Sequence, residues 1–226
     1  MPTLEDIRNR VRQILDDTSG DRFSSVMLDT AIRQALARLD ERMPLIRSLD
    51  LQITTSGRDV TLTGLDHPLY LIEVYILPAS TGSMPASAGG SKQEAKTGYS
   101  YSLQGTSGSL HFNGTSLLSV GECLRVTYAA QNTLTGLEGA TETSLPDAAS
   151  EALETGAASF ACLLRAASLA ETYGARAGES ARLVEQSKLW KQISEESLSK
   201  LKTFQHFEFP AGFALDKWDQ GNREAG

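Results

Sequence analysis

Residue types central to enzyme chemistry are scarce in this sequence, which has two cysteines and three histidines among 226 residues. Cys123 and Cys162 lack the spacing of a metal site, so each is expected to be a buried free thiol. His67, His111 and His206 are far apart, and no two share the spacing of a zinc-hydrolase motif. We therefore predict no metal, no cofactor and no catalytic residue.

Motifs of acyl and phosphoryl transfer are missing as well. There is no G-x-S-x-G and no glycine-rich phosphate loop. Ser197–Lys200 matches S-x-x-K and Lys96–Gly98 matches K-T-G, two elements of penicillin-recognising enzymes, but their order is reversed and S-D-N is absent. The paired acids Asp16–Asp17 and Glu195–Glu196 are expected to be solvated charges. The protein is expected not to be an enzyme.

Long apolar runs and an excess of basic charge are also absent. The run Leu69–Leu77 contains Glu73 and falls well short of the roughly 20 residues of a membrane span. The first residues show no apolar signal core, which favours the cytoplasm or a particle assembled there. With 21 basic and 28 acidic residues the net charge is −7. Such a chain is poorly suited to gripping DNA, yet it suits a surface past which DNA slides.

Two apolar stripes of helical period open the chain. The first predicts a helix over about 3–16, capped by Thr3, and consists of Leu4, Ile7, Val11, Ile14 and Leu15. The second predicts a helix from Ser24 or Ser25 that Pro44 ends, and consists of Leu28, Ile32, Ala35, Leu36, Leu39 and Met43. The two helices are expected to form an antiparallel hairpin.

Alternation of period two replaces the helical spacing near Leu49. Leu49–Ile53 and Val60–Leu62 predict a β-hairpin. Further strands are expected at Tyr70–Leu77, Tyr99–Leu103, Ser109–Phe112 and Cys123–Ala129. Together they predict a small antiparallel sheet, sandwich or open barrel. Residues 78–98 inside it, rich in Ser, Gly, Ala and Pro, are expected either to form a flexible loop or to be ordered by a neighbour.

Helical character returns at Ser144, a candidate cap, followed by Pro146 and Asp147 in the first turn. This helix is expected to reach about Tyr173 and to end at Gly174. Small residues in its centre allow close helix approach, and they are Ala148, Ala149, Ala152, Gly156, Ala157, Ala158, Ala161, Ala166 and Ala167. A fourth helix is expected over 179–203.

The end of the chain is rich in aromatic residues and has no helical pattern after Thr203. Five of the nine Phe and Trp residues lie there, namely Phe204, Phe207, Phe209, Phe213 and Trp218. Pro210 and Gly212 interrupt any periodicity. The segment is therefore predicted to be an extended arm, which either folds back over its own domain or docks on another subunit.

The fold class predicted from these patterns is α+β: a bundle of four helices in two hairpins, with an inserted antiparallel β-sheet or sandwich. The predicted divisions are 1–48 for the first hairpin and 49–143 for the β-rich insertion with its loop 78–98. Residues 144–203 form the long helices and 204–226 the aromatic arm.

This order of parts resembles the head-to-tail adaptor, or connector, proteins of tailed bacteriophages. The resemblance covers about 4–43 and 145–203. It lies in Leu4–Arg12 followed by Leu15–Asp17, in the L-x-x-A-I-x-x-A-L pattern that begins at Leu28, and in Leu145–Asp147 before a helix rich in Ala and Gly.

The resemblance implies a virion protein of the neck, assembled in the host cytoplasm as a homo-oligomeric ring, typically of twelve copies. The ring would sit between the portal protein and a downstream neck, stopper or tail protein, and genomic DNA would pass through it without specific binding. By the same resemblance, Phe204, Phe207, Phe209, Phe213 and Trp218 are the candidates for portal docking. No membrane partner is implied.

An alternative stays open at this point. The insertion could be a β-sandwich module that binds a receptor or carbohydrate, carried on a helical base in a virion. Tyr70, Tyr75, Tyr99 and Tyr101 are available as stacking surfaces, although packing in a core is the simpler interpretation.

Overall fold

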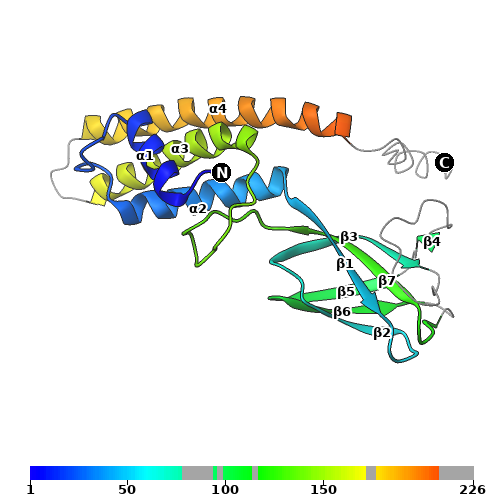
Figure 1. The fold of residues 1–226 in the computed structure, drawn as a ribbon. Helices are drawn as coiled ribbons and strands as arrows, with labels where there is room; N and C mark the ends of the chain where they lie inside the picture. The colour runs from blue at the N-terminus through cyan, green and yellow to red at the C-terminus, as the bar shows by residue number, and fades with distance from the viewer. Residues whose placement is uncertain (78–93, 96–98, 114–116, 172–176, 209–226) are drawn as a thin grey trace, which may run out of the picture. The chain divides into compact units, whose positions relative to one another are not determined.

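The protein divides into two units, and the chain passes from one to the other twice (Figure 1). The computed structural model describes residues 1–77, 94–95, 99–113, 117–171 and 177–208. A helical unit contains residues 1–43 and the chain from 133 onward, and a sheet unit contains residues 44–132. The predicted α+β class is confirmed.

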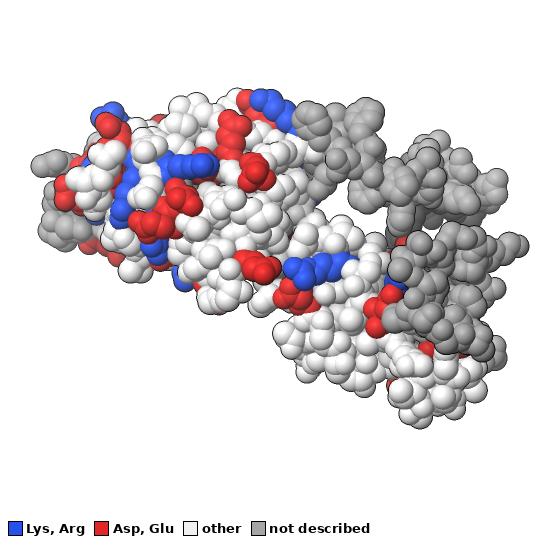
Figure 2. All heavy atoms as spheres, viewed as in Figure 1, with Lys and Arg blue, Asp and Glu red and all other residues white. Residues whose placement is uncertain are grey.

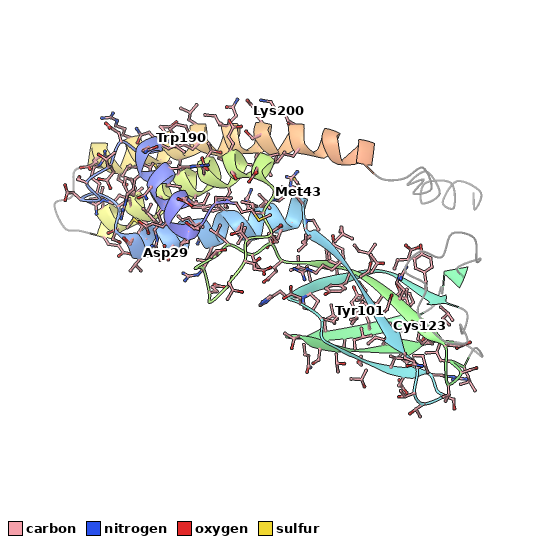
Figure 3. The ribbon with its side chains drawn as sticks, in the orientation of Figure 1. Asp29, Met43, Tyr101, Cys123, Trp190 and Lys200 are labelled. Atoms are coloured by element: carbon pink, nitrogen blue, oxygen red, sulfur yellow. The ribbon has the colours of Figure 1, made fainter. Side chains whose placement is uncertain are left out.

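The first two helices follow the predicted stripes. In α1 (Leu4–Ile14) the Asp6 N–H donates to Thr3 Oγ1 and the Thr3 N–H donates to Asp6 Oδ2, a complete capping box. These bonds lower the pKa of Asp6. The helix α2 (Ser25–Arg42) is capped by Ser24, whose Oγ accepts from the Met27 N–H. Arg8 on α1 donates to Asp29 on α2 at 2.8 Å, which links the two helices; Figure 3 labels Asp29 on α2.

The turn between these helices corrects one expectation. Asp17 is not a solvated charge, because its side chain is buried and its carboxylate accepts from the backbone N–H groups of Arg22 and Phe23 at 3.1 and 2.8 Å. A carboxylate that satisfies two orphan N–H groups stabilises a turn. Asp17 therefore fixes the entry into α2.

The segment 133–146 belongs to the helical unit, so the predicted insertion boundaries, 49 and 143, shift to 44 and 132. Leu134 and Leu137 are buried in the helical core, and the Leu4 N–H donates to the Thr135 carbonyl. Ser144 is not a helix cap: its Oγ accepts from the Thr133 N–H at 2.8 Å. Pro146 instead occupies the N-cap position of a short 3₁₀ turn, η1 (Asp147–Ala149), which leads into α3 (Ser150–Glu171).

The fourth helix is longer than predicted. It runs as α4 from Ala177 to Glu208, so the expected end at Thr203 and the non-helical start of the arm at Phe204 are wrong. Aromatic residues do not break a helix, and the described part of α4 continues through Phe204 and Phe207 to Glu208. Its 32 residues span about 48 Å. Gly174, the predicted stop of α3, lies outside the described residues.

The sheet unit contains two antiparallel sheets. One has the order β1-β7-β3-β4 and the other β2-β6-β5. The strands are β1 (Leu45–Gln52), β2 (Asp59–Thr63), β3 (Pro68–Leu77), β4 (Glu94–Ala95), β5 (Tyr99–Gln104), β6 (Ser107–Phe112) and β7 (Cys123–Ala130). Leu62, Leu110 and Phe112 from one sheet share a core with Val74, Leu124 and Val126 from the other. The sequence left a single sheet, a sandwich or an open barrel as alternatives, and two sheets around one core correspond to the sandwich.

The predicted hairpin between the first two strands is wrong, because β1 pairs with β7 and β2 pairs with β6. The residues between β1 and β2 carry the chain from one sheet to the other, with a bridge from Gly57 to Leu118. The strand β1 also starts four residues earlier than expected. Arg47 interrupts its apolar alternation, but an ion pair with Asp66 at 2.9 Å accommodates the charge.

Of the predicted loop 78–98, the structure describes Glu94 and Ala95, whose backbone pairs with Ile76 and Tyr75. The rest of that segment lies outside the described residues, so the choice between a flexible and an ordered loop stays untested.

The ion pair between Asp50 and Arg125 links β1 to β7. Arg125 Nε and Nη2 donate to the two carboxylate oxygens of Asp50, both at 2.7 Å. This bidentate geometry lowers the pKa of Asp50, against a smaller opposing effect of burial. Tyr75 lies opposite Arg125 on β3, and burial together with a hydrogen bond to Glu73 raises its pKa to about 12.

Replacing a buried residue of α2 should cost far more stability than replacing an exposed one. Ile32 is fully buried, so Ile32→Ala should lower the free energy of unfolding by about 2–5 kcal/mol. Val26 on the same helix is 77% exposed, so Val26→Ala should change the free energy of unfolding by less than about 0.5 kcal/mol. Urea unfolding followed by circular dichroism measures both. Equal losses of stability in the two variants would contradict the assignment of Ile32 to the buried face of α2 and of Val26 to the exposed face.

Removing the Asp50 carboxylate should weaken the protein at neutral pH and have no effect in strong acid. A carboxylate whose pKa is lowered on folding adds stability above its ordinary value near 3.8, and this is lost as the pH falls through the lowered value. The stability difference between the parent and Asp50→Asn should therefore vanish below that range in pH-dependent urea unfolding. In an Arg125→Gln background the same substitution should have little effect at any pH. If Asp50→Asn still lowered the free energy of unfolding in the Arg125→Gln background, the Asp50–Arg125 pairing would be contradicted.

Candidate functional site

The reactive side chains that the structure describes are separated from one another. His111 Nδ1 contacts Asp59 Oδ1 at 2.6 Å across β6 and β2, and His67 lies in the turn before β3. Cys162 is a buried free thiol as predicted, and burial raises its pKa to about 11. Cys123 is only half-buried, which corrects the expectation for that residue (Figure 3). Within the described ranges, no three His, Cys, Asp or Glu side chains gather to hold a metal ion.

The structure describes only the backbone of the first predicted arm residues, up to Glu208. Phe204 and Phe207 belong to the backbone of the last turns of α4, and their side chains lie outside the described part. Phe209, Phe213 and Trp218 lie outside it altogether. Their role as a portal interface therefore stays a prediction. What the structure does place is the helix that carries the chain into this arm.

Small residues bring α3 and α4 together along a regular seam. Ser194 Oγ donates to the Ala152 carbonyl at 2.7 Å, and Ser180 Oγ donates to the Ala166 carbonyl at 3.0 Å. Between them, Ser159 Oγ donates to the Ser187 carbonyl at 2.9 Å. The contact positions recur every seven residues on each helix and in opposite order, the repeat of an antiparallel coiled coil.

Gly156 on α3 lies close to both α2 and α4. A Cβ at this position would lie 3.1 Å from Ser194 Oγ on α4 and 3.4 Å from the Ala35 Cβ on α2. Only a glycine fits without displacing a neighbour. The sequence predicted close packing from the Ala- and Gly-rich run, but it did not indicate that α2 would share the contact.

A three-helix groove of about 290 Å³ opens beside this point. Small residues line much of its floor, and they are Ala35 from α2, Ala152, Gly156 and Ser159 from α3, and Ser194 from α4. Phe160, Leu163 and Leu198 add larger apolar surface. Leu163 is 42% exposed, although it is a large apolar side chain. The groove is thus an apolar recess open to solvent.

Cations outnumber anions at this groove. Arg38 and Arg42 from α2 and Lys191 from α4 line it together with a single carboxylate, Glu195. Glu195 lies 3.6 Å from Arg38 and 3.9 Å from Lys191, and it is half-exposed as predicted for a solvated acid. Arg42 has no carboxylate partner among the described residues. The groove therefore suits an occupant that is apolar and acidic.

The groove has a surplus of cations, although the helical unit that contains it has a net negative charge. The sheet unit has five basic and six acidic residues, so the helical unit holds the other 16 basic and 22 acidic ones. Figure 2 shows both signs mixed over the visible face of the helical unit and fewer charges on that of the sheet unit. The sequence pattern did not indicate that Arg38 and Arg42 would border a groove.

Enlarging Gly156 should push the three helices apart. Gly156→Val should lower the free energy of unfolding by about 1–3 kcal/mol, because Ser194 and Ala35 leave no room for the added carbons. Gly178 in the first turn of α4 has open space around it, so Gly178→Val should change stability by less than about 0.5 kcal/mol. Thermal and urea unfolding of both variants provides the measurement. A neutral Gly156→Val would show that the seam can widen freely.

Along the described part of the chain, no helix is both long enough and apolar enough to cross a membrane. Neither a protein-family model nor a curated protein matches this chain.

Proposed function

We propose that this protein is a structural subunit of a bacteriophage head-to-tail adaptor ring, placed between the portal and the next neck or tail component. The observation that carries the proposal is the course of the chain through the helical unit. Two short-linked helices come first, a sheet unit follows, and a small-residue helix and a 32-residue helix end the described chain. This order is the one in which the sequence resembles adaptor proteins.

The chemistry of the groove supports a structural role. Its serine hydroxyls donate to backbone carbonyls: Ser159 to Ser187, Ser194 to Ala152 and Ser199 to Glu196. A hydroxyl held in this way lacks the adjacent base that activates a nucleophile. The raised pKa of Cys162 likewise keeps that thiol protonated at neutral pH.

The charge of the chain also supports the proposal. The helical unit carries the larger share of the −7 net charge. Repeated around a ring, this charge would make the assembly strongly acidic, and an acidic wall repels the phosphates of DNA. A channel built in this way would let DNA pass without holding it.

The alternative of a carbohydrate-binding module gains little support from the tyrosines. Tyr70 on β3 and Tyr101 on β5 are both exposed, but these strands belong to different sheets. Tyr99 is half-buried and packs edge-on against Phe112, with 6.3 Å between ring centroids. Tyr75 is partly buried and bonded to Glu73. The four rings therefore do not line one strand or one sheet as a stacking platform.

Electron microscopy of the purified protein mixed with portal rings of the same virus tests the proposed function. We expect an added layer of density at one end of the portal, with rotational symmetry. A protein that stays monomeric and never joins the portal would overturn the proposal. A monomeric state of the isolated chain would not by itself overturn the proposal, because an adaptor could form its ring only when it docks on the portal.

Replacing two aromatic residues of the arm should weaken portal binding without unfolding the protein. Phe207→Ala combined with Phe209→Ala removes two rings, and aromatic anchors carry much of the free energy of an interface. We expect portal co-sedimentation to be lost while the urea unfolding midpoint stays within error. Leu189→Ala is a matched control, because Leu189 is a large apolar side chain of α4 that is 55% exposed and lies outside the arm. An unfolding midpoint that falls only in the double variant would assign these rings to the core of the helical unit.

A further inference from the structure

We infer that the three-helix groove is the seat of the chain's own C-terminal segment, with the Trp218 side chain inserted in it. The inference concerns the free protein and does not depend on the adaptor role. It rests on three properties of the groove and the segment: reach, side-chain chemistry and charge.

The length of the segment matches the position of the groove. Groove residues on α4 run from Lys191 to Ser199, which lies about 14–26 Å before the helix end at Glu208. Eighteen residues follow Glu208, and Pro210 and Gly212 are types that favour a chain reversal. After such a reversal, the six residues from Phe213 to Trp218 cover about 20 Å when extended. Trp218 thereby reaches the level of Glu195, near the middle of the groove.

The lining of the groove suits an aromatic side chain. The groove has a volume of about 290 Å³, and much of its lining is apolar. Its floor of Ala, Gly and Ser leaves a recess that larger side chains would have filled. Phe160 and Leu163 offer apolar contacts on the α3 side. Insertion of the Trp218 ring would cover the exposed part of Leu163.

The charges of the two partners are complementary. Asp216 and Asp219 stand on either side of Lys217 and Trp218, so the inserted stretch is acidic by one charge. Arg38, Arg42 and Lys191 at the groove exceed Glu195 by two charges. The helical unit as a whole is acidic, but the charges that line this recess attract an acidic segment.

Docking within one chain is favoured over docking on a second copy. A short connection holds the segment at a millimolar effective concentration near its own groove. The C-terminal segment of a second copy, present at micromolar concentration, competes poorly with the segment of the same chain. The expected state of the isolated protein is therefore a monomer with its groove filled in cis.

Fluorescence of Trp218 in the full-length protein tests this inference. Trp190→Phe leaves Trp218 as the only tryptophan, since the chain has two. A docked Trp218 should emit at short wavelength and resist quenching by acrylamide. Leu163→Glu places a carboxylate in the groove and should shift the emission to the red and raise the quenching constant. Leu189→Glu is the matched control, because Leu189 is 55% exposed but lies outside the groove, and it should leave both values unchanged.

A second variant keeps the test independent of folding defects in the bundle. Asp216→Lys with Asp219→Lys leaves the bundle unchanged and should also expose Trp218. A Trp218 that is fully quenchable in the Trp190→Phe protein overturns the inference. Protection that appears only as the protein concentration rises also overturns it and assigns the segment to a second copy. Protection retained in both Leu163→Glu and the lysine variant would place Trp218 elsewhere.

Discussion

The close approach of α3 and α4 sets the geometry of the helical unit. Three serine hydroxyls, at positions 180, 187 and 194 of α4, meet α3 at intervals of seven residues, and Ser180 and Ser194 donate directly to its backbone carbonyls. Short side chains allow this distance, and hydrogen bonds satisfy the polar groups that the packing buries. Gly156 extends the same contact to α2. The groove exists because three helices converge on residues too small to fill the space between them.

The sheet unit has a separate hydrophobic core, built from residues of its own two sheets. The helical core draws instead on α1 to α4 and on Leu134 and Leu137 of the connecting segment. Because each unit buries its own apolar residues, a change in one core need not alter the packing of the other. This organisation suits a protein in which one part forms the scaffold and the other contributes a surface, whichever partner that surface contacts.

Elements with one buried face could be predicted from the sequence, and features that depend on distant partners could not. The stripes of α1 and α2 were correct because each helix buries a single row of apolar residues against the core. The hairpin was wrong because the alternation in β1 and β2 shows that they are strands but not which strands they pair with. Ser144 has the sequence of a cap, but its partner is Thr133, eleven residues before it. The burial of Asp17 likewise depends on the backbone course five and six residues later.

The candidate site also contains one feature that the sequence predicts and one that it does not. The aromatic arm was visible in the composition, since aromatic residues gather there irrespective of fold. The groove was not, because Arg38, Gly156 and Lys191 meet only after three helices have packed. If the arm rests in this groove before assembly, the two interpretations of the arm are successive states and not alternatives. In that case a single arm has to leave only one recess of about 290 Å³. If the proposed ring forms, a portal that engages several of its arms would gain from multivalency and could displace them together, although each cis contact is favoured in the free chain.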